Sequence, residues 1–519
     1  MELLKKEIRC NVIGRKAADQ FFVDDDVNVP DSKRDVARVI ISEGKVKVDD
    51  IRLVENYARV TGKILYQILY ATDEAESTLA SLQGKLPFEE MIYLEEEPRG
   101  QIHLKTCHTE LQVSVIHSRK LNIKAMTELE IGAEWEQSVQ ITSDMEGSQE
   151  FYKKFEHRNL LKLQTSRKDT YRIKEEIKLS GTRENIGMLL WTNAALRKLD
   201  TRLGRDELLL RGEIQVFCFY QSPEGKTDWI EQNVPYEGRV ECYGADDTMF
   251  HYLYAELTDE NIDVRMDEDG EMRILGVEAT LELRVLVYEE ENIQILKDVY
   301  SLREECNPQM EEVKLESLVM QNHSKYKLTE QLSLPEIKDS ILQICHSNGY
   351  LQITHTERVA EGIMVEGMLH VLFLYVKADD QVPFDIWQGM VPFTHVIETK
   401  DISPEMHYDI GNELEQLSIG LMGNDAVEVK GALGFRVFLR KEEPVFNIRN
   451  VQVEPVDMEA AAKAPGIVGY IVKEGDDLWG LAKKYSTTME GIREMNGLAE
   501  GDLRPGDKIL IFKENLSIL

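Results

Sequence analysis

The feature that most constrains this 519-residue chain is a short segment that occurs three times. Each copy begins with Gly and ends with Tyr eight positions later, and apolar residues alternate between them. The copies are residues 62–70, 212–220 and 367–375. Alternation with a period of two predicts a β-strand, and because the second face is also partly apolar we expect burial on both sides. The Gly inside a strand pattern indicates a bulge or a bend.

The repeat extends on both sides of this segment. A Pro followed by an aromatic residue comes 25, 23 and 25 positions after the Gly, at Pro87, Pro235 and Pro392. Apolar residues spaced by three also recur 26 and 23 positions before it: Val36 and Val39, Ile186 and Leu189, Ile341 and Ile344. A Pro or Ser precedes each of these pairs, so the spacing predicts a short amphipathic helix at the start of each unit.

We therefore expect a multidomain, mainly β chain. Each of three repeats should be a small sandwich or open barrel with short helices, closed by a late strand at 121–131, 274–288 or 427–439. The Asp-Gly pair at 269–270 predicts a hairpin turn before the second of these strands. The expected domains are 1–165, 166–320 and 321–455, then a linker at 456–467 and a last domain at 468–515.

The charge of the chain limits its partners. The formal net charge is −33, with 42% hydrophobic and 30% charged residues, which is typical of a soluble globular protein. Nucleic acid needs a Lys/Arg face and anionic lipid repels such a chain, so we expect neither as a partner. Residues 470–513 hold seven basic and eight acidic residues, so the excess negative charge lies in the repeats. A basic protein partner suits that body, and simple solubility is the alternative.

The apolar runs and the cysteines bear on the compartment. The longest apolar run, at 371–376, is far shorter than the roughly 18 residues that span a bilayer, so we expect no membrane-spanning segment. The first twenty residues are charged throughout and predict no signal peptide. Six scattered cysteines without a CxxC pair indicate reduced thiols. We expect the protein to stay in the compartment that makes it.

The last domain has a βααβ pattern. A short strand at 470–472 leads through a turn at Gly475 into a helix that Asp476 and Asp477 can cap. Thr487 or Thr488 can cap a second helix, and a turn at 504–507 precedes a closing strand at 508–512. The residues expected to face inward are Leu478, Leu481, Ala482, Ile492 and Met495, with Trp479 beside the first helix.

This segment, with Tyr…GDxLW…Asn…PGxxI, is similar to the LysM domain. In LysM families an N-acetyl-glucosamine chain lies in a groove between the first strand–helix loop and the loop before the last strand. The resemblance implies a binding groove or protein-binding face made of Gly475, Asp476, Asp477, Leu478, Trp479, Asn496, Gly497, Leu498, Leu503, Arg504 and Pro505. The alternative for Asp477 is a helix cap, and for Asn496 a helix end.

No catalytic motif emerges from the sequence. The chain has no P-loop, no GxGxxG opening a helix, no HExxH and no GxSxG. His103, Cys107 and His108 fit no zinc spacing and indicate an ordinary strand, as do Cys345, His346 and His355. The acidic run at 267–270 lacks the first and twelfth ligands of a calcium loop. We predict no catalytic residue, no metal site and no cofactor.

The three repeats resemble the SPOCS-domain repeats of endospore-forming bacteria over residues 25–455, on the Pro or Ser start, the Gly…Tyr strand and the Pro-aromatic strand. Followed by a LysM domain, they look like the spore-coat morphogenetic proteins. That resemblance implies a non-enzymatic scaffold in the mother-cell cytoplasm, at the forespore surface and in the spore coat. It also implies a partner, the coat-basement morphogenetic ATPase (stage four sporulation protein A), which would tether the coat to the forespore.

Two alternatives remain for the function. One is a peptidoglycan-binding wall protein, and the other is a cortex or peptidoglycan hydrolase anchored by its LysM domain. Both make N-acetyl-glucosamine glycan the ligand of the groove. Because cortex glycan lies beyond the forespore's outer membrane, we expect the LysM face of a mother-cell scaffold to bind protein instead.

Overall fold

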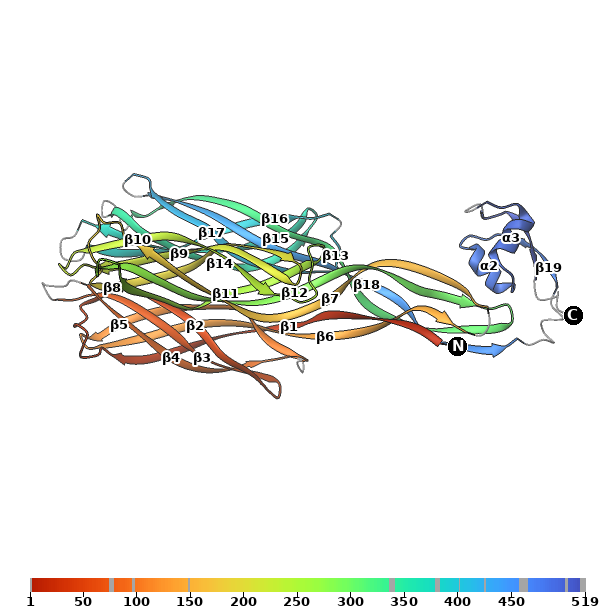
Figure 1. Ribbon diagram of the computed structural model, residues 1–519, viewed down its shortest axis with the longest axis horizontal. Helices are drawn as coiled ribbons and strands as arrows, with labels where there is room; N and C mark the ends of the chain where they lie inside the picture. Colours follow the sequence, from red (N-terminus) through yellow and green to blue (C-terminus); the bar gives the residue numbers. More distant parts are fainter. Residues whose placement is uncertain are drawn as a thin grey trace.

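The computed structural model describes residues 2–73, 79–95, 99–147, 150–335, 341–378, 383–400, 402–423, 426–456, 465–499 and 503–513. Long antiparallel strands make up the body, and a small domain with two helices follows it. Figure 1 shows an elongated molecule with a broad head, a narrower stalk and the C-terminal domain beyond the end of the stalk. No helix in the described ranges is long and apolar enough to cross a membrane.

In the described ranges, the body contains three units of six strands each. Unit 1 has β1 (Glu2–Asn28), β2 (Arg38–Val54), β3 (Tyr57–Ala71), β4 (Leu79–Tyr93), β5 (Gln101–His117) and β6 (Lys120–Glu146). Unit 2 has β7 (Tyr152–Lys178), β8 (Met188–Gly204), β9 (Glu207–Gln221), β10 (Thr227–Glu241), β11 (Phe250–Met266) and β12 (Met272–Tyr300). Unit 3 has β13 (Glu304–Ser333), β14 (Ile341–Val359), β15 (Gly362–Lys377), β16 (Phe384–Glu398), β17 (Met406–Leu421) and β18 (Ala426–Pro455).

Each unit is a sandwich of two three-stranded sheets. In unit 1 the sheets are β1-β6-β5 and β2-β3-β4, and units 2 and 3 repeat this order. All pairs are antiparallel, and the inward residues of both sheets form one apolar core per unit. The expected β-rich repeats, their sandwich form and their late closing strands are confirmed, with the late strands lying in β6, β12 and β18.

The Gly…Tyr strands are the central strands β3, β9 and β15. The aromatic residue of each Pro-aromatic pair lies directly across the ladder from the Gly: Gly62 and Phe88, Gly212 and Tyr236, Gly367 and Phe393. A Cβ added at Gly62 would lie 2.8 Å from Cζ of Phe88, and one at Gly367 would lie 2.7 Å from Cζ of Phe393. The ring therefore occupies the space that a side chain would need, which explains why the two motifs recur together.

The short helix predicted at the start of each unit is wrong within the described residues. Val36 and Ile186 lie in the crossings between the two sheets, while Val39, Leu189, Ile341 and Ile344 lie in strands. Backbone amides of these crossings donate across the sandwich, Val36 to Ser118 and Ile186 to Met272. Two residues three apart reach the same core because the chain changes sheet and a register shift follows at Val39, and this mimics helical spacing.

Strand pairing divides the body between residues 146 and 152 and between 300 and 304. β7 runs through residue 165 and β13 runs through residue 320. Most of the expected linker, 457–464, lies outside the described residues, and residue 467 already belongs to the next strand.

The first and last strands of each unit continue past the sandwich as a two-stranded ribbon. The ribbons pair 2–13 with 134–146, 152–163 with 288–300, and 304–318 with 440–455. A register shift stands at the start of each ribbon, between Ile13 and Lys16, between Val287 and Tyr288, and between Leu318 and Met320. Such shifts bend and twist a ladder, so they mark the place where head becomes stalk.

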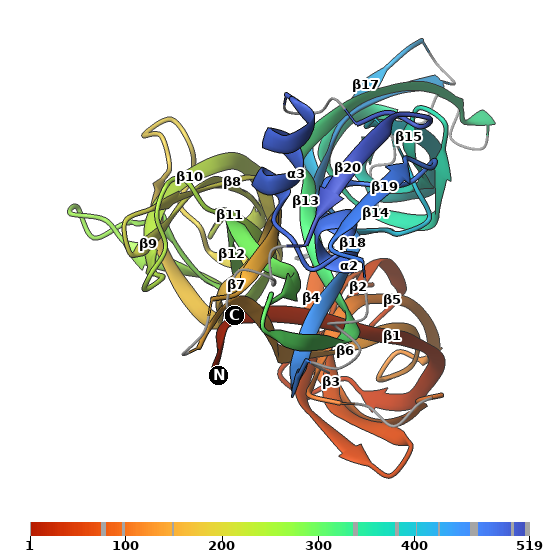
Figure 2. The same cartoon turned by 90° about the vertical axis from the view of Figure 1, so that its right-hand side faces the viewer.

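The three ribbons form the stalk around one axis. One shared cluster contains Ile8, Ile141, Leu160, Ile293, Ile295, Leu315 and Val445, which come from all three units. A second cluster nearer the end contains Met145, Leu296, Val299, Cys306, Ile448 and Val451. Figure 2 shows the units as three lobes around the axis. The stalk, which the sequence did not predict, is a pseudo-threefold bundle made within one chain.

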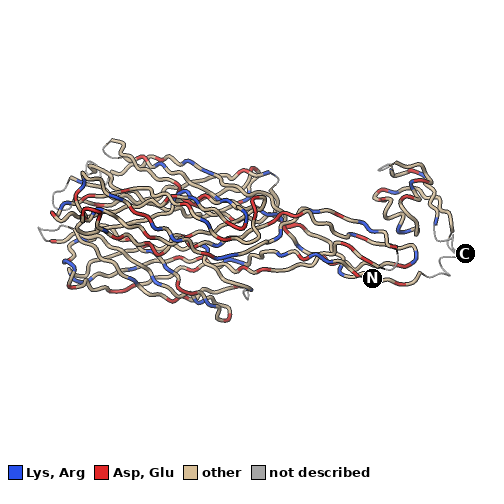
Figure 3. The backbone as a smooth tube through the Cα atoms, viewed as in Figure 1, with Lys and Arg blue, Asp and Glu red and all other residues tan. Residues whose placement is uncertain are grey.

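The axis of the head is apolar at its far end and polar in the middle. At the far end, Leu69, Trp191, Phe217, Phe219, Leu374 and Phe384 pack together across the units. This contact buries part of the second face of the Gly…Tyr strands, at Leu69, Phe217, Phe219 and Leu374, whereas Leu65 on that face of β3 is 39% exposed. A cavity of about 1690 Å³ lies between the units and is lined by charged residues of both signs. Acidic and basic residues are interleaved along the backbone of the body (Figure 3).

Candidate functional site

The C-terminal domain has the βααβ order that the sequence predicts. Its elements are β19 (Ile467–Ile471), α2 (Leu478–Lys484), α3 (Met489–Asn496) and β20 (Lys508–Phe512), and β19 pairs with β20. Leu481, Ala482 and Ile492 are buried as expected, and Leu478 packs partly buried against them. Met495, which was expected to face inward, is half exposed.

Both helices begin at side-chain caps. The carboxylate of Asp477 accepts from the amide of Gly480 at 2.8 Å, and the hydroxyl of Thr488 accepts from the amide of Gly491 at 2.9 Å. Asp476 instead accepts from the hydroxyl of Tyr470 and from a backbone amide. Gly475 has a φ of 88°, in the left-handed region that favours Gly. The helix cap predicted for Asp477 is confirmed, and its carboxylate remains partly exposed.

Hydrogen bonds of Asn496 hold the second wall of the expected groove, which starts at that residue, against the rest of the domain. The side chain of Asn496 donates to the carbonyls of Ile492 and Leu510 and accepts from the amide of Leu510, so it ties α3 to β20. Gly497 ends α3 with a φ of 62°. Leu498 and Leu503 are partly buried against the domain core, while Arg504 and Pro505 are exposed in the turn before β20. Asn496 therefore has a structural role, and among the expected residues of this wall Gly497, Arg504 and Pro505 are the exposed ones.

The domain sits on the end of the stalk. Nε1 of Trp479 donates to Asp298 at 2.8 Å, and Nζ of Lys483 donates to the other oxygen of Asp298 at 2.6 Å. The rings of Trp479 and Tyr300 meet edge to face with centroids 5.0 Å apart, and the hydroxyl of Tyr300 donates to the carbonyl of Thr487. We call this contact the seat. It buries Trp479 to 7% exposure and consists of residues from unit 2 and the C-terminal domain.

Described residues of both loops of the expected groove stay exposed beside the seat. Gly475, Asp477, Gly497, Arg504 and Pro505 are all exposed. An ion pair of 2.8 Å joins Lys154 on β7 to Asp477 in the first loop. Of the described residues of the expected face, Trp479 is the buried one, and it contacts Asp298 and Tyr300 of the stalk.

Sequence reasoning missed the stalk half of the seat. Asp298 and Tyr300 end the last strand of unit 2, more than 170 residues before Trp479. The one signal was a pair of tyrosines, Tyr152 and Tyr300, which open and close that unit and stack with centroids 4.9 Å apart. Aromatic residues at the tip of a ribbon indicate a contact with something beyond it.

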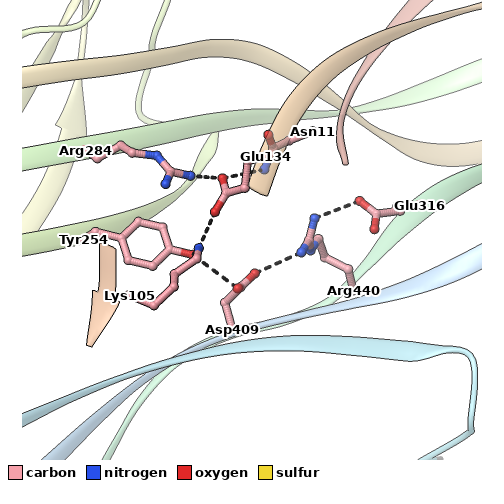
Figure 4. Close-up of polar contacts among 8 residues, drawn as sticks. All are labelled: Asn11, Lys105, Glu134, Tyr254, Arg284, Glu316, Asp409 and Arg440. Carbon is pink, nitrogen blue, oxygen red and sulfur yellow. Dashed lines mark hydrogen bonds and ion pairs between the residues drawn. The ribbon is translucent and has the colours of Figure 1, made fainter. Parts of the chain in front are cut away.

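A buried ionic network lies on the axis where the head becomes the stalk (Figure 4). The carboxylate of Glu134 in unit 1 bonds Arg284 of unit 2 and Lys105 of its own unit. Arg440 in unit 3 bonds Asp409 at 2.9 Å and Glu316 at 3.0 Å. The side chain of Arg440 is 2% exposed and that of Glu134 is 3% exposed. Pairs this deeply buried require every charge to keep its partner.

The residues set aside as ordinary strand residues do not converge on a site. Cys107 faces the core of unit 1, while His103 and His108 line the cavity on the other face. Burial raises the pKa of the Cys107 thiol to about 12 and lowers the pKa of His103 to about 3. Residues 267–270 form the hairpin turn between β11 and β12, with Gly270 at a φ of 80°.

Comparison with protein families matches both parts of the chain. The profile described as SipL, SPOCS domain matches residues 35–118, 185–266 and 340–422, and the profile of the LysM domain matches 470–512. The chain is a SipL-like SPOCS/LysM protein. No curated protein and no solved structure matches significantly. SPOCS and LysM are non-catalytic domain families, and together they are typical of sporulation proteins of the coat with a peptidoglycan-binding type of module.

The three SPOCS matches cover the same strands in each unit. They include β2–β5, β8–β11 and β14–β17, and they leave out the first and last strand of every unit. The unmatched strands are those that continue into the stalk. The stalk and the unit 2 half of the seat, Asp298 and Tyr300, therefore lie outside the family matches, whereas Trp479 and Lys483 lie inside the LysM match.

Proposed function

We propose that this chain is a non-enzymatic adaptor of spore-coat assembly that tethers the coat to the forespore surface. Its LysM loops, 475–478 and 496–505, bind the coat-basement morphogenetic ATPase, stage four sporulation protein A. The combination of three SPOCS domains and a LysM domain supports this proposal. The observation that carries it is the seat, which holds the LysM domain at the tip of the stalk and leaves Gly475, Asp477, Gly497, Arg504 and Pro505 exposed.

The charge of the two regions also supports a protein partner. The LysM stretch is nearly neutral, whereas the whole chain carries −33. A partner that approaches the tip of the stalk therefore meets a face that does not repel it. In this proposal the adaptor acts in the mother-cell cytoplasm, and the seat sets the direction in which the loops point.

The second candidate is glycan binding, which the LysM family match favours. In that case the same two loops would hold N-acetyl-glucosamine residues, as in a peptidoglycan-binding wall protein or a hydrolase anchored by its LysM domain. The two candidates share a surface and differ in ligand, so one experiment separates them.

The test uses the full-length chain and measures its binding to the ATPase and to N-acetyl-glucosamine oligomers. Arg504→Glu reverses an exposed charge in the second loop, and Lys508→Glu makes the same change of charge on β20. The proposal predicts roughly tenfold weaker ATPase binding for Arg504→Glu and unchanged binding for Lys508→Glu. Saturable oligomer binding that Arg504→Glu weakens, with no affinity for the ATPase, would support the glycan-binding candidate instead.

A further inference from the structure

Three potential metal ligands converge on one sheet of unit 3. The imidazole of His323 on β13 and the carboxylates of Glu413 and Glu415 on β17 meet across the central strand β18. Nε2 of His323 lies 3.0 Å from Oε1 of Glu413 and 3.2 Å from Oε1 of Glu415. Within the described ranges, no other group of three His, Cys, Asp or Glu side chains comes as close. We call these residues the triad.

A glycine makes room for the triad. Gly434 on β18 is paired with Glu413, and a Cβ there would lie 2.8 Å from Nε2 of His323 and 2.9 Å from Cγ of Glu413. β17 also has a register shift between Leu414 and Gln416, so Glu415 has no partner on β18. The bulge lets the carboxylate of Glu415 turn toward the same point as that of Glu413.

Units 1 and 2 lack this arrangement. When the three closing strands are aligned by their buried residues, Gly434 corresponds to Glu282 in unit 2 and to Glu128 in unit 1. Each of these glutamates has a side chain where unit 3 has an open space. The general SPOCS architecture therefore does not require the triad, and its cause is local to unit 3.

The two carboxylates of the triad are buried. The side chains of Glu413 and Glu415 are 9% and 8% exposed, and the facing atoms Nε2, Oε1 and Oε1 make no well-aligned hydrogen bond. Burial raises the pKa of Glu413, but the contact with His323 and the charge of Arg436 outweigh it and leave that pKa below its usual value. Two cations stand nearby, with Lys325 2.7 Å from Glu415 and Arg436 3.9 Å from Glu413.

We propose that His323, Glu413 and Glu415 bind one Zn²⁺ ion. Zn²⁺ accepts imidazole nitrogen and carboxylate oxygen at about 2.0–2.2 Å in a tetrahedron, whose edges are then about 3.3 Å. The two distances from Nε2 are close to that edge. An imidazole ligand disfavours Mg²⁺ and Ca²⁺, which take oxygen ligands. His323 is 30% exposed, so a water molecule can complete the coordination.

The ion takes over a role that Lys325 has in its absence. The side chain of Lys325 is 59% exposed, so its ammonium can turn into solvent when a divalent cation neutralises Glu415. The bound ion links β13 to β17 across β18. Glu413 also accepts a backbone hydrogen bond from Leu199 of unit 2, so the ion strengthens the sheet where units 2 and 3 meet.

The test titrates the chelator-treated full-length protein with Zn²⁺ and follows binding by calorimetry. We expect one equivalent that His323→Ala weakens by at least about 100-fold. His355→Ala is the matched control in the same unit, because the side chain of His355 is 57% exposed and its Nε2 lies 4.0 Å from the carboxylate of Glu357. Lys325→Gln should tighten Zn²⁺ binding several-fold, since it removes the competing cation.

The Lys325→Gln variant also distinguishes the proposal from a simple ion-pair network. Its substitution lies on an exposed side chain, so the fold survives, and circular dichroism melts of each variant confirm this. If the wild type and His323→Ala bind Zn²⁺ equally, or if neither binds it, the triad is an ion-pair network and the proposal is wrong. Unchanged Zn²⁺ affinity in Lys325→Gln would also contradict it.

Discussion

The head and the stalk are made from the same strands, yet they bury their apolar residues in different ways. In the head, Leu129 of β6 packs inside unit 1, in a core that belongs to that unit. Farther along the same strand, Ile141 packs against Leu160, Leu315 and other residues of units 2 and 3. Apolar residues alternate with a period of two in both parts of the strand. The head and the stalk therefore differ in which units pack against those residues.

In the head each SPOCS unit therefore has a core of its own, with a contact between units at the end away from the stalk, whereas in the stalk the three units share their core. Side chains reinforce the sharing: the amide of Thr142 in unit 1 donates to Asn447 of unit 3 at 2.8 Å, and the hydroxyl of Thr142 donates to the carbonyl of Ile448. A ribbon of two strands is marginal alone, and three ribbons supply the burial that one lacks. The LysM seat then rests on a support that all three units maintain.

The largest effect should come from the junction between the two regions. Arg440→Leu leaves Asp409 and Glu316 without their buried partner, which should cost about 3–5 kcal/mol of unfolding free energy. Chemical denaturation measures this loss. The surface substitution Arg211→Leu is the control, because the side chains of Arg211 and its partner Glu237 are both more than two-thirds exposed. This substitution should cost less than about 1 kcal/mol of unfolding free energy. Equal costs for the two variants would contradict the role of the network.

The seat on the stalk should show the next effect. Trp479→Ala removes a buried ring from Tyr300 and should destabilise the LysM domain by about 3–5 kcal/mol. Trp479→Phe keeps much of the packing but loses the donor to Asp298, so its cost should be about 1–3 kcal/mol. Thermal melting with a probe in the LysM domain distinguishes the variants. Unchanged melting in both would show that the domain does not depend on its seat.

A substitution at a glycine in the head tests whether the core of each unit is stable independently of the other two units. Gly367→Ala places a Cβ 2.3 Å from the carbonyl oxygen of Gln352 and should cost about 1–3 kcal/mol. Gly420→Ala, in the same unit, meets no atom within 4 Å and should be nearly neutral. Hydrogen exchange should show the Gly367→Ala effect confined to unit 3. An equal rise in exchange in the heads of units 1 and 2 would contradict the conclusion that each unit has a core of its own in the head.

The smallest effect should be a pH response of the head. His346 of unit 3 stacks on Phe217 of unit 2, and burial lowers its pKa, although Glu231 opposes the shift. The folded chain favours the neutral imidazole, so stability that is present above pH 6.5 is lost as the pH falls toward the folded pKa. His346→Gln should flatten the melting temperature between pH 7 and about pH 5 relative to wild type.

The exposed histidine His355 provides the control for this pH series. Its side chain is 57% exposed, so His355→Gln should leave the pH profile of the wild type unchanged. A wild-type profile that is flat, or one that His346→Gln does not alter, would show that this contact between the units does not sense pH.

Local pattern predicted the sandwich and the LysM domain because both depend on short-range periodicity. The alternation around Gly62, Gly212 and Gly367 is sufficient to place the central strands, and Asp477 caps its helix from three residues away. The helix predicted at Val36 failed because a crossing between sheets places two residues of that spacing in one core. Periodicity alone cannot distinguish these cases over so few residues.

The stalk and the sites could not be predicted because their residues meet across units. Ile8 and Val445 share a cluster although they lie near opposite ends of the amino-acid sequence of the body. His323 and Glu413 are ninety positions apart, and nothing between them indicates a shared ligand. Trp479 was singled out as an aromatic at the LysM face, but its partner Asp298 belongs to another domain. Such contacts depend on how the repeats pack, which no single repeat encodes.

The most direct test of the shared stalk is hydrogen exchange in Ile141→Asp, a change in the ribbon of unit 1 alone. Ile141 is fully buried in the common cluster. The account predicts faster exchange in all three ribbons, including 288–300 and 440–455, while the central strands β3, β9 and β15 stay protected. Faster exchange restricted to β1 and β6 would contradict the account, because it would show that each ribbon is stable without the other two.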